Sequence, residues 1–103
     1  MSIRKSVCSG TWYSSNKDIL KSEIESYLKD IKKLNFVPKI IVVPHAGYQF
    51  SGGVAAKAFA QIPKNTKKVI ILGTAHHYPL IGASICNKDA YETPLGNVNI
   101  CQE

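Results

Sequence analysis

Three histidines are the residues of this chain best suited to chemistry, and two of them occupy matching positions. His45 follows an apolar run at 40–44, and His76, 31 residues further along, follows a second apolar run at 69–72. Neutral imidazole is the commonest metal ligand in proteins and suits zinc, iron and copper. Because two adjacent histidines rarely face one ion, we take His45 and His76 as the metal ligands. His77 then has a supporting, acid–base or packing role.

The expected elements alternate between helices and strands in an order that would bring the two histidines together. We predict helices at 16–34 and 52–61, and strands at 39–43, 68–72 and 81–86. Strand, helix and strand in this order form a right-handed parallel crossover, so both strands end at one edge of the sheet. His45 and His76 are therefore expected to be neighbours in the crevice where open α/β sheets bind ligands. The predicted fold class is α/β, with a parallel or mixed sheet and flanking helices.

Local signals bound the two predicted helices. Residues 15–18 resemble a capping box at the start of the first helix, and Asn35 and Pro38 mark its end. Ser51, among three glycines, is the expected N-cap of the second helix. Backbone amides there could hold an anion, or the glycines could serve turn geometry alone. Trp12 and Tyr13 precede the first helix and either pack against it or form an aromatic wall of the crevice.

Two histidines do not complete a metal site. A structural zinc site has four ligands, and a non-haem iron site typically has two histidines and a carboxylate. Asp89, Cys86 and Cys101 are the other candidates, but none has a diagnostic spacing. We expect the third ligand beyond Glu103 and expect this chain to be the front part of a larger domain.

Composition excludes several classes of protein. Among the thirteen basic residues arginine occurs once, at Arg4, and the lysines are scattered, so the net charge of +6 does not indicate nucleic-acid binding. The chain has no apolar run near the ~18 residues that a membrane helix needs. Three cysteines without a C-x-x-C spacing favour a reducing, cytoplasmic setting over a disulfide framework.

Five ordered motifs resemble those of the Memo family, the AmmeMemoRadiSam system protein B group. They are S-G-T-W-Y at 9–13, V-P-H-A-G-Y at 43–48, S-G at 51–52, I-L-G-T-A-H-H at 71–77 and Y-E-T-P-L-G at 91–96. The resemblance covers nearly the whole chain and implies that residues 1–103 are the N-terminal portion of one Memo-like domain. That domain is similar to the catalytic subunit of class III extradiol dioxygenases, which are non-haem iron enzymes.

The resemblance also implies roles for individual residues. His45 and His76 would be the metal ligands, and a cysteine later in the family sequence, matched by neither Cys86 nor Cys101, would be the third. Trp12 would line the mouth of the pocket. Phe50 stands where relatives often carry tyrosine, so a hydroxyl is missing at the rim.

Two functions from different classes follow. The first is a redox metalloprotein, a possible dioxygenase-like oxidoreductase, with Fe²⁺ or copper on His45 and His76 and with His77 or Tyr48 moving protons. Its family partners would be radical-SAM and AMMECR-type proteins. The second is a non-catalytic module that binds a peptide or phosphopeptide in the same crevice, lined by Trp12, Tyr13, Phe50 and Ser51. An inactive truncated fragment is a third possibility, and no nucleic-acid or membrane partner is expected.

Overall fold

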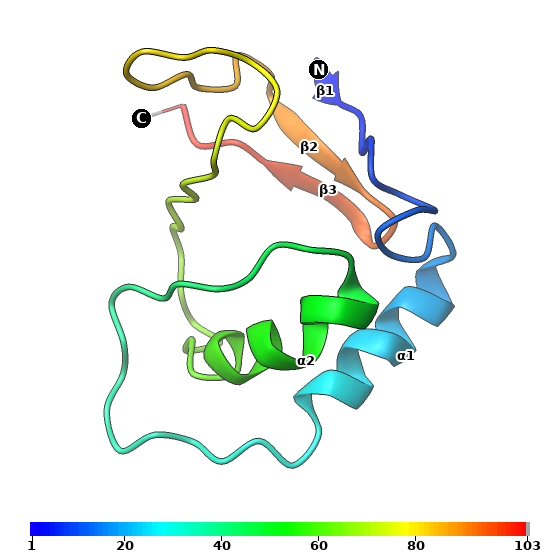
Figure 1. Ribbon diagram of the computed structural model, residues 1–103, viewed down its shortest axis with the longest axis vertical. Coiled ribbons are helices and arrows are strands. Elements are labelled where there is room, and N and C mark those ends of the chain that lie inside the picture. Colours follow the sequence, from blue (N-terminus) through cyan, green and yellow to red (C-terminus); the bar gives the residue numbers. More distant parts are fainter. Residues whose placement is uncertain (103) are drawn as a thin grey trace.

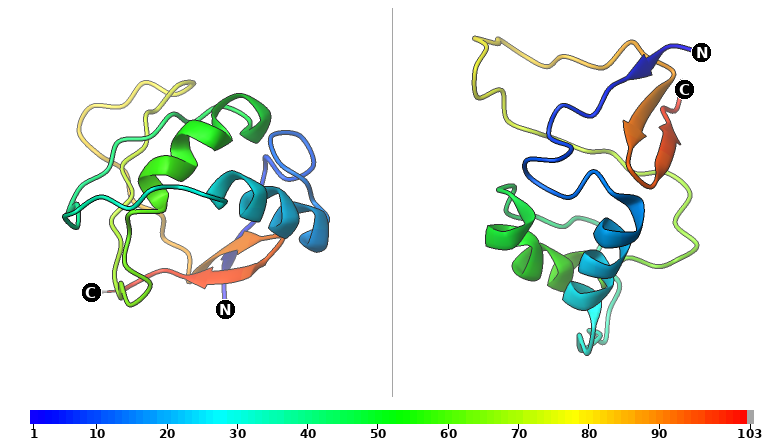
Figure 2. Two further views of the ribbon diagram at one scale, coloured as in Figure 1. Left: turned by 90° about the horizontal axis from the view of Figure 1, so that it is seen from below. Right: turned by 90° about the vertical axis from the view of Figure 1, so that its right-hand side faces the viewer.

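The computed structural model describes residues 1–102 and places two helices at one end of the molecule and a sheet at the other (Figure 1; Figure 2). In chain order the elements are β1 (Ile3–Arg4), α1 (Lys17–Leu28), α2 (Tyr48–Phe59), β2 (Ala90–Thr93) and β3 (Gly96–Asn99). The α/β prediction is confirmed at this level: two helices and a mixed three-stranded sheet with one parallel pair. In the described part of the chain, no helix is long and apolar enough to cross a membrane.

The sheet joins the start of the chain to its last described residues. Its order is β1-β2-β3: β1 runs parallel to β2 with Ile3 opposite Ala90, and β3 returns antiparallel to β2. Gly96 lies opposite Thr93 across a two-residue turn, and the Thr93 hydroxyl donates a 2.7 Å hydrogen bond to the Gly96 carbonyl. Ala90, in the central strand, is fully buried. The sheet therefore depends on a contact between segments more than eighty residues apart.

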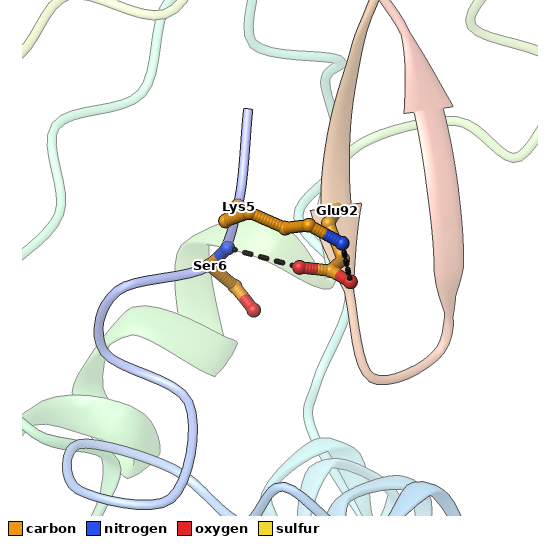
Figure 3. A network of polar contacts seen from close by, with 3 residues as sticks. All are labelled: Lys5, Ser6 and Glu92. Carbon is orange, nitrogen blue, oxygen red and sulfur yellow. Dashed lines mark hydrogen bonds and ion pairs between the residues drawn. The ribbon is translucent and has the colours of Figure 1, made fainter. Parts of the chain in front are cut away.

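Polar contacts hold β1 against β2. Asp89 Oδ2 accepts hydrogen bonds from the Ser2 amide at 2.5 Å and from the Ser2 hydroxyl at 3.0 Å. Glu92 accepts from the Lys5 ammonium at 3.1 Å and from the Ser6 amide at 3.4 Å (Figure 3). The Ser2 donors lower the pKa of Asp89, and the Lys5 and Ser6 donors lower the pKa of Glu92, because they favour the charged carboxylates.

Helix α1 starts one residue later than predicted, capped by Asn16 rather than by a capping box from Ser15, and it ends early. The Asn16 side-chain oxygen accepts from the amides of Asp18 and Ile19, both at 3.0 Å, so Asn16 is the N-cap. The helix ends at Leu28 because Lys29 is extended and Asp30 has a φ of +56°, a conformation that aspartate tolerates better than most residues. The prediction of a helix to residue 34 is therefore wrong.

After Leu28, where helical turns were expected, the chain instead makes hydrogen bonds to the end of α2. The Leu34 amide donates to Gln61 Oε1 at 2.8 Å, and the Gln61 side-chain amide donates to the Lys32 carbonyl at 3.2 Å. Lys33 Nζ also donates to the Ala60 carbonyl. These tertiary bonds satisfy backbone groups that would otherwise need intrahelical partners, so the apolar spacing beyond Leu28 does not extend the helix.

Helix α2 starts earlier than expected and has a different cap. Gly47 is its N-cap, and the amides of Phe50 and Ser51 donate to the Gly47 carbonyl at 2.9 and 3.1 Å. The N-cap assignment of Ser51 is wrong, because Ser51 already lies in the first turn. Its buried hydroxyl donates to the Ala46 carbonyl at 2.9 Å and so holds the entering chain against the helix.

The two helices form the packed part of the molecule. Leu20 of α1 is only 3% exposed, and Ala56 of α2 is also buried. Gly52 of α2 lies directly against the Tyr27 ring of α1: a Cβ at Gly52 would stand 2.7 Å from Tyr27 Cε2. Close approach of α1 and α2 therefore requires glycine at position 52.

The predicted strands at 39–43, 68–72 and 81–86 are wrong. Within residues 1–102 none of these runs forms a strand, and the parallel crossover built from the first two is therefore wrong as well. A β-strand needs a neighbouring strand to accept and donate its backbone hydrogen bonds, and among the described residues none of the three runs pairs with another strand. In the third run Gly82, with a φ of +86°, also turns the chain.

Candidate functional site

The two histidines named from the sequence meet in the structure. His45 Nε2 lies 2.9 Å from His76 Nε2, and the two ring centroids are 5.1 Å apart with the planes tilted by 37°. The His77 ring stands 6.2 Å from that of His76, and all three side chains are exposed. The predicted proximity of His45 and His76 is confirmed although the crossover that suggested it is not formed. Their role as ligands stays a prediction.

The loop that enters α2 positions His45. The Tyr48 amide donates to the Trp12 carbonyl at 2.8 Å, which ties this loop to the segment before α1. Two residues from Tyr48, the Ala46 carbonyl accepts the Ser51 hydroxyl. His45 is therefore followed directly by backbone that is held on two sides, by α2 and by the Trp12 loop.

A separation of 2.9 Å between two imidazole nitrogens admits two arrangements. In one, a protonated Nε2 donates a hydrogen bond to an unprotonated Nε2. In the other, both lone pairs face one ion: nitrogens each about 2.1 Å from a metal and about 90° apart at it lie about 3.0 Å from one another. Right-angled imidazole ligands are compatible with the octahedral and tetragonal geometries of iron and copper.

The described residues supply these two nitrogens and no further ligand cluster. Across residues 1–102 no group of three or more histidine, cysteine or acidic side chains is placed to hold an ion. The candidates Asp89 and Cys86 belong instead to the neighbourhood of the sheet, where Asp89 accepts from Ser2. The pair fits a metal as a partial site, with the remaining coordination positions open.

The Tyr48 side chain lies beside the hairpin formed by β2 and β3. Its ring packs on Tyr13 with centroids 5.4 Å apart, and both tyrosines line a hollow of about 410 Å³ together with Leu20, Ile24 and residues 93–98. Burial raises the pKa of the Tyr48 phenol, and Tyr13 and Glu23 raise it further. A raised pKa makes the phenol a weaker acid, and the assignment of Tyr48 to proton transfer stays a prediction.

A second hollow lies between the segment before α1 and the start of α2. It has a volume of about 610 Å³, and its lining includes Ala46, which follows His45 in the chain, together with Trp12, Tyr13 and Phe50. Trp12 is 49% exposed and Phe50 76% exposed, so both rings can be reached by a ligand. The structure thus brings three of the four predicted pocket residues together, whereas the Ser51 hydroxyl is buried against the Ala46 carbonyl.

Sequence reasoning missed Glu23, which places a carboxylate in the lining of this second hollow. Glu23 also accepts a hydrogen bond from the Tyr27 hydroxyl at 3.2 Å. Burial is the larger cause that raises the pKa of Tyr27, and this hydrogen bond is the next. The signal was available, because Glu23 stands beside Leu20, Ile24 and Tyr27 on the apolar stripe of α1 rather than on its lysine-rich face.

A second group that the sequence did not indicate surrounds Cys86. Hydrogen bonding from the Lys88 amide is the largest cause that lowers the pKa of the Cys86 thiol; burial opposes it, and Tyr91 and Arg4 add to the lowering. The Arg4 guanidinium carbon lies 5.9 Å from the centroid of the Tyr91 ring. This grouping arises from the parallel pairing of β1 with β2, which no local pattern predicts.

Comparison with known proteins places the chain in a family. The profile of the family described as Memo-like protein matches residues 4–103. Protein MEMO1 of Homo sapiens is 34% identical over 101 residues, which cover 97% of this chain and 34% of that protein. Protein MEMO1 of Danio rerio is 34% identical over 104 residues, covering 100% of this chain and 35% of that protein.

A fungal relative has a similar relationship to the chain. The MEMO1 family protein MHO1 of Saccharomyces cerevisiae is 33% identical over 105 residues, which cover 97% of this chain and 31% of that protein. The chain spans about a third of the length of the curated relatives it matches. The chain belongs to the Memo-like family, and the resemblance inferred from its five motifs is confirmed.

Proposed function

We propose that this member of the Memo-like family binds iron or copper through His45 and His76 and contributes to a redox centre. The observation that carries the proposal is the 2.9 Å separation of the two Nε2 atoms, from segments 31 residues apart. When bound, either metal supplies one-electron chemistry and open coordination positions. The family membership supports the same reading, because both histidines lie within the matched residues.

The chain's own residues would serve this centre in distinct ways. His45 and His76 orient their Nε2 atoms toward the shared position. His77, whose ring lies 6.2 Å from that of His76, is a candidate to move protons at the centre. Tyr48, three residues after His45, is the other candidate to move a proton; its phenol lines the hollow beside the β2–β3 hairpin, and burial raises its pKa, which makes it a weaker acid.

The cellular location and the partner proteins are part of the same proposal. The three cysteines are free, which supports a reducing, cytoplasmic location. The Memo resemblance supports radical-SAM and AMMECR-type proteins as partners of the complete protein. Retention of such proteins from cell extract on the immobilised chain, lost in a His45→Ala variant, would support this assignment; equal retention would count against a role for the histidine pair in it.

Metal titration tests the central proposal. We expect wild-type chain to bind Cu²⁺, used as the probe because it binds imidazole most strongly among the divalent ions considered, and anaerobic Fe²⁺ more weakly. Loss of one ligand in His45→Ala or His76→Ala should lower Cu²⁺ affinity at least about ten-fold, since even supporting residues contribute that much. His77→Ala is the comparison variant and should lower the affinity less than the loss of either ligand. Equal affinity in all four proteins would refute the proposal.

A second candidate function rests on the hollow that Trp12, Phe50 and Glu23 line. The exposed rings of Trp12 and Phe50 can hold an aromatic or aliphatic side chain of a peptide. The Glu23 carboxylate in the same lining favours a basic peptide and opposes a phosphorylated one. Binding of a lysine- and tyrosine-containing peptide that weakens in Trp12→Ala and Glu23→Gln would favour this function, and tighter binding of its phosphorylated form would contradict the charge assignment.

A further inference from the structure

The net charge of this chain is concentrated in two short segments. Residues 29–33 and 57–68 together contain seven lysines and one aspartate, which gives them a net charge of +6. The six basic and six acidic residues in the rest of the chain cancel. Although the lysines are scattered along the sequence, the whole excess of positive charge therefore belongs to these two segments.

The structure joins the two segments at one end of the helix pair. Gln61 Nε2 donates to the Lys57 carbonyl at 3.0 Å and to the Lys32 carbonyl at 3.2 Å, so one side chain bridges both segments. Lys33 Nζ donates to the Ala60 carbonyl, and α1 and α2 end on the same side of the molecule (Figure 1). The seven exposed lysines of the two segments are called the lysine end here: Lys29, Lys32, Lys33, Lys57, Lys64, Lys67 and Lys68.

A turn keeps the later lysines close to this end. The Thr66 amide donates to the Pro63 carbonyl at 3.1 Å, and the Thr66 hydroxyl donates to the same carbonyl at 2.8 Å. This turn begins shortly after α2 ends at Phe59, so Lys64 and Lys67 stay near the helix end. The positive charge is therefore gathered on one surface.

Helix stabilisation accounts for only part of this charge. The C-terminus of a helix carries about half a negative charge, and a nearby cation stabilises it. Lys57, in the last turn of α2, and Lys33, at the Ala60 carbonyl, supply such cations. Two helix ends together offset about one of the six net positive charges. The remaining like charges repel one another, and an anionic partner would relieve that repulsion.

We propose that the lysine end is a docking surface for a short segment of a partner protein that is rich in aspartate and glutamate. Charge complementarity carries the assignment. Lysine ammonium groups are mobile point charges, which attract carboxylates without a fixed geometry. Exposed ion pairs are individually weak, so the affinity comes from several pairs formed together. The lysine end includes neither His45 nor His76, and the inference does not depend on metal binding.

The limited extent of the lysine end favours a short acidic segment over a nucleic acid. Outside the two segments the charges of the chain cancel, so a longer polyanion would gain no further net attraction there. The single arginine, Arg4, lies in β1 and outside the lysine end. Arginine is the residue that makes bidentate contacts with phosphates and bases, and none is available on this surface.

Fluorescence anisotropy tests the proposal with a fluorescein-labelled peptide of about six glutamates separated by glycines, which matches the charge of the surface. EDTA is present throughout, so failure of this test leaves the metal proposal standing, and the reverse also holds. We expect binding at about 20 mM salt that weakens about ten-fold or more by about 150 mM, because salt screens exposed charges. Absence of binding at the lower salt concentration would overturn the proposal.

Competition identifies the kind of anion that the surface prefers. Unlabelled glutamate peptide should displace the labelled peptide at lower concentration than single-stranded DNA of the same net charge. It should also act at lower concentration than vesicles that contain phosphatidylserine. Stronger displacement by the DNA or by the vesicles would overturn the assignment to an acidic polypeptide.

A triple variant removes charge from the lysine end itself. In Lys32→Gln/Lys57→Gln/Lys64→Gln three exposed ammonium groups are lost, and the peptide should bind about ten-fold more weakly or worse, because three weak pairs are lost together. The Lys32 and Lys57 carbonyls still accept from Gln61, so circular dichroism should show the helix content of wild type.

A matched control removes the same net charge elsewhere. Lys17→Gln/Lys21→Gln/Lys88→Gln alters the first half of α1 and the segment before β2. Lys17 and Lys21 lie about 10–16 Å along α1 from its end at Leu28. At about 0.1 M salt, charges are largely screened beyond about 10 Å, so this variant should weaken binding by less than about three-fold. Equal losses in the two triple variants would overturn the proposal, because binding would then follow the net charge of the whole chain.

Discussion

The helix pair buries apolar side chains, whereas the apolar runs at 40–43, 69–72 and 81–85, called the open runs here, expose them. Leu20 in α1 is 3% exposed, whereas Leu72 at the end of the second open run is 93% exposed. The backbone groups of each helix form hydrogen bonds within that helix, and the apolar side chains of the two helices pack against each other. The open runs need backbone partners that residues 1–102 do not offer. Stability therefore resides in the helix pair and the sheet, while the histidine pair is carried by segments that add little to it.

The largest expected effect separates these two regions directly. Leu20→Ala should lower the free energy of unfolding by about 2–5 kcal/mol, because it removes a buried side chain and leaves a cavity. Leu72→Ala makes the identical change at an exposed site and should alter it by no more than about 0.5 kcal/mol. Urea unfolding followed by circular dichroism measures both. Comparable losses for the two variants would mean that the open runs are packed in solution.

The next effect tests the contact between the helices. Gly52→Ala places a Cβ 2.7 Å from Tyr27 Cε2, whereas a Cβ at Gly53 meets the same ring at an ordinary 3.8 Å. Gly53→Ala should be neutral or stabilising by up to about 1 kcal/mol through helix propensity. Overpacking should make Gly52→Ala about 1–3 kcal/mol less stable than Gly53→Ala. If the two alanine variants are equally stable, α1 and α2 do not approach as closely as described.

The cap of α1 has a smaller effect. Asn16→Ala removes the oxygen that accepts from the amides of Asp18 and Ile19 and should cost about 1 kcal/mol. Asn16→Asp keeps an acceptor next to the positive end of the helix and should cost less. Thermal unfolding ranks the variants. An Asn16→Ala protein as stable as Asn16→Asp would show that α1 is held by packing alone.

The smallest effect concerns the sheet at acid pH. The pKa of Asp89 is lowered below its ordinary value of 3.8 by the Ser2 amide and hydroxyl. A carboxyl whose folded pKa is lowered stabilises the fold above its unfolded pKa, and this contribution disappears as the pH falls through the folded pKa. Asp89→Asn should therefore flatten the loss of stability below about pH 4. Ser2→Ala keeps the amide donor and should reduce this loss of stability at acid pH less than Asp89→Asn does. The same loss of stability at acid pH in Asp89→Asn and wild type would contradict the contact between Asp89 and Ser2.

Local features were predictable from the sequence and non-local ones were not. The polar residues at 15–18 and the apolar spacing that follows them predict the start of α1 to within one residue. The end of α1 was mispredicted because bonds from Leu34 and Lys33 to the end of α2 override the helical pattern. The sheet was mispredicted because β1 pairs with β2 from the far end of the sequence.

The candidate site shows the same division. His45 and His76 could be named because histidine follows an apolar run in both segments, and the structure brings them together. Ser51 was expected to cap α2 or line the pocket, and the structure instead gives its hydroxyl to the Ala46 carbonyl. Glu23 and the surroundings of Cys86 depend on which segments pack together, which residue types alone do not reveal.

Pulsed electron paramagnetic resonance of the chain with one equivalent of Cu²⁺ tests the central claim most directly, because the remote nitrogen of each bound imidazole modulates the electron spin echo. The structure predicts two imidazoles on the copper in wild type and in His77→Ala, and one in either His45→Ala or His76→Ala. The same number of imidazoles in wild type, His45→Ala and His76→Ala would contradict the assignment of His45 and His76 as a shared metal site.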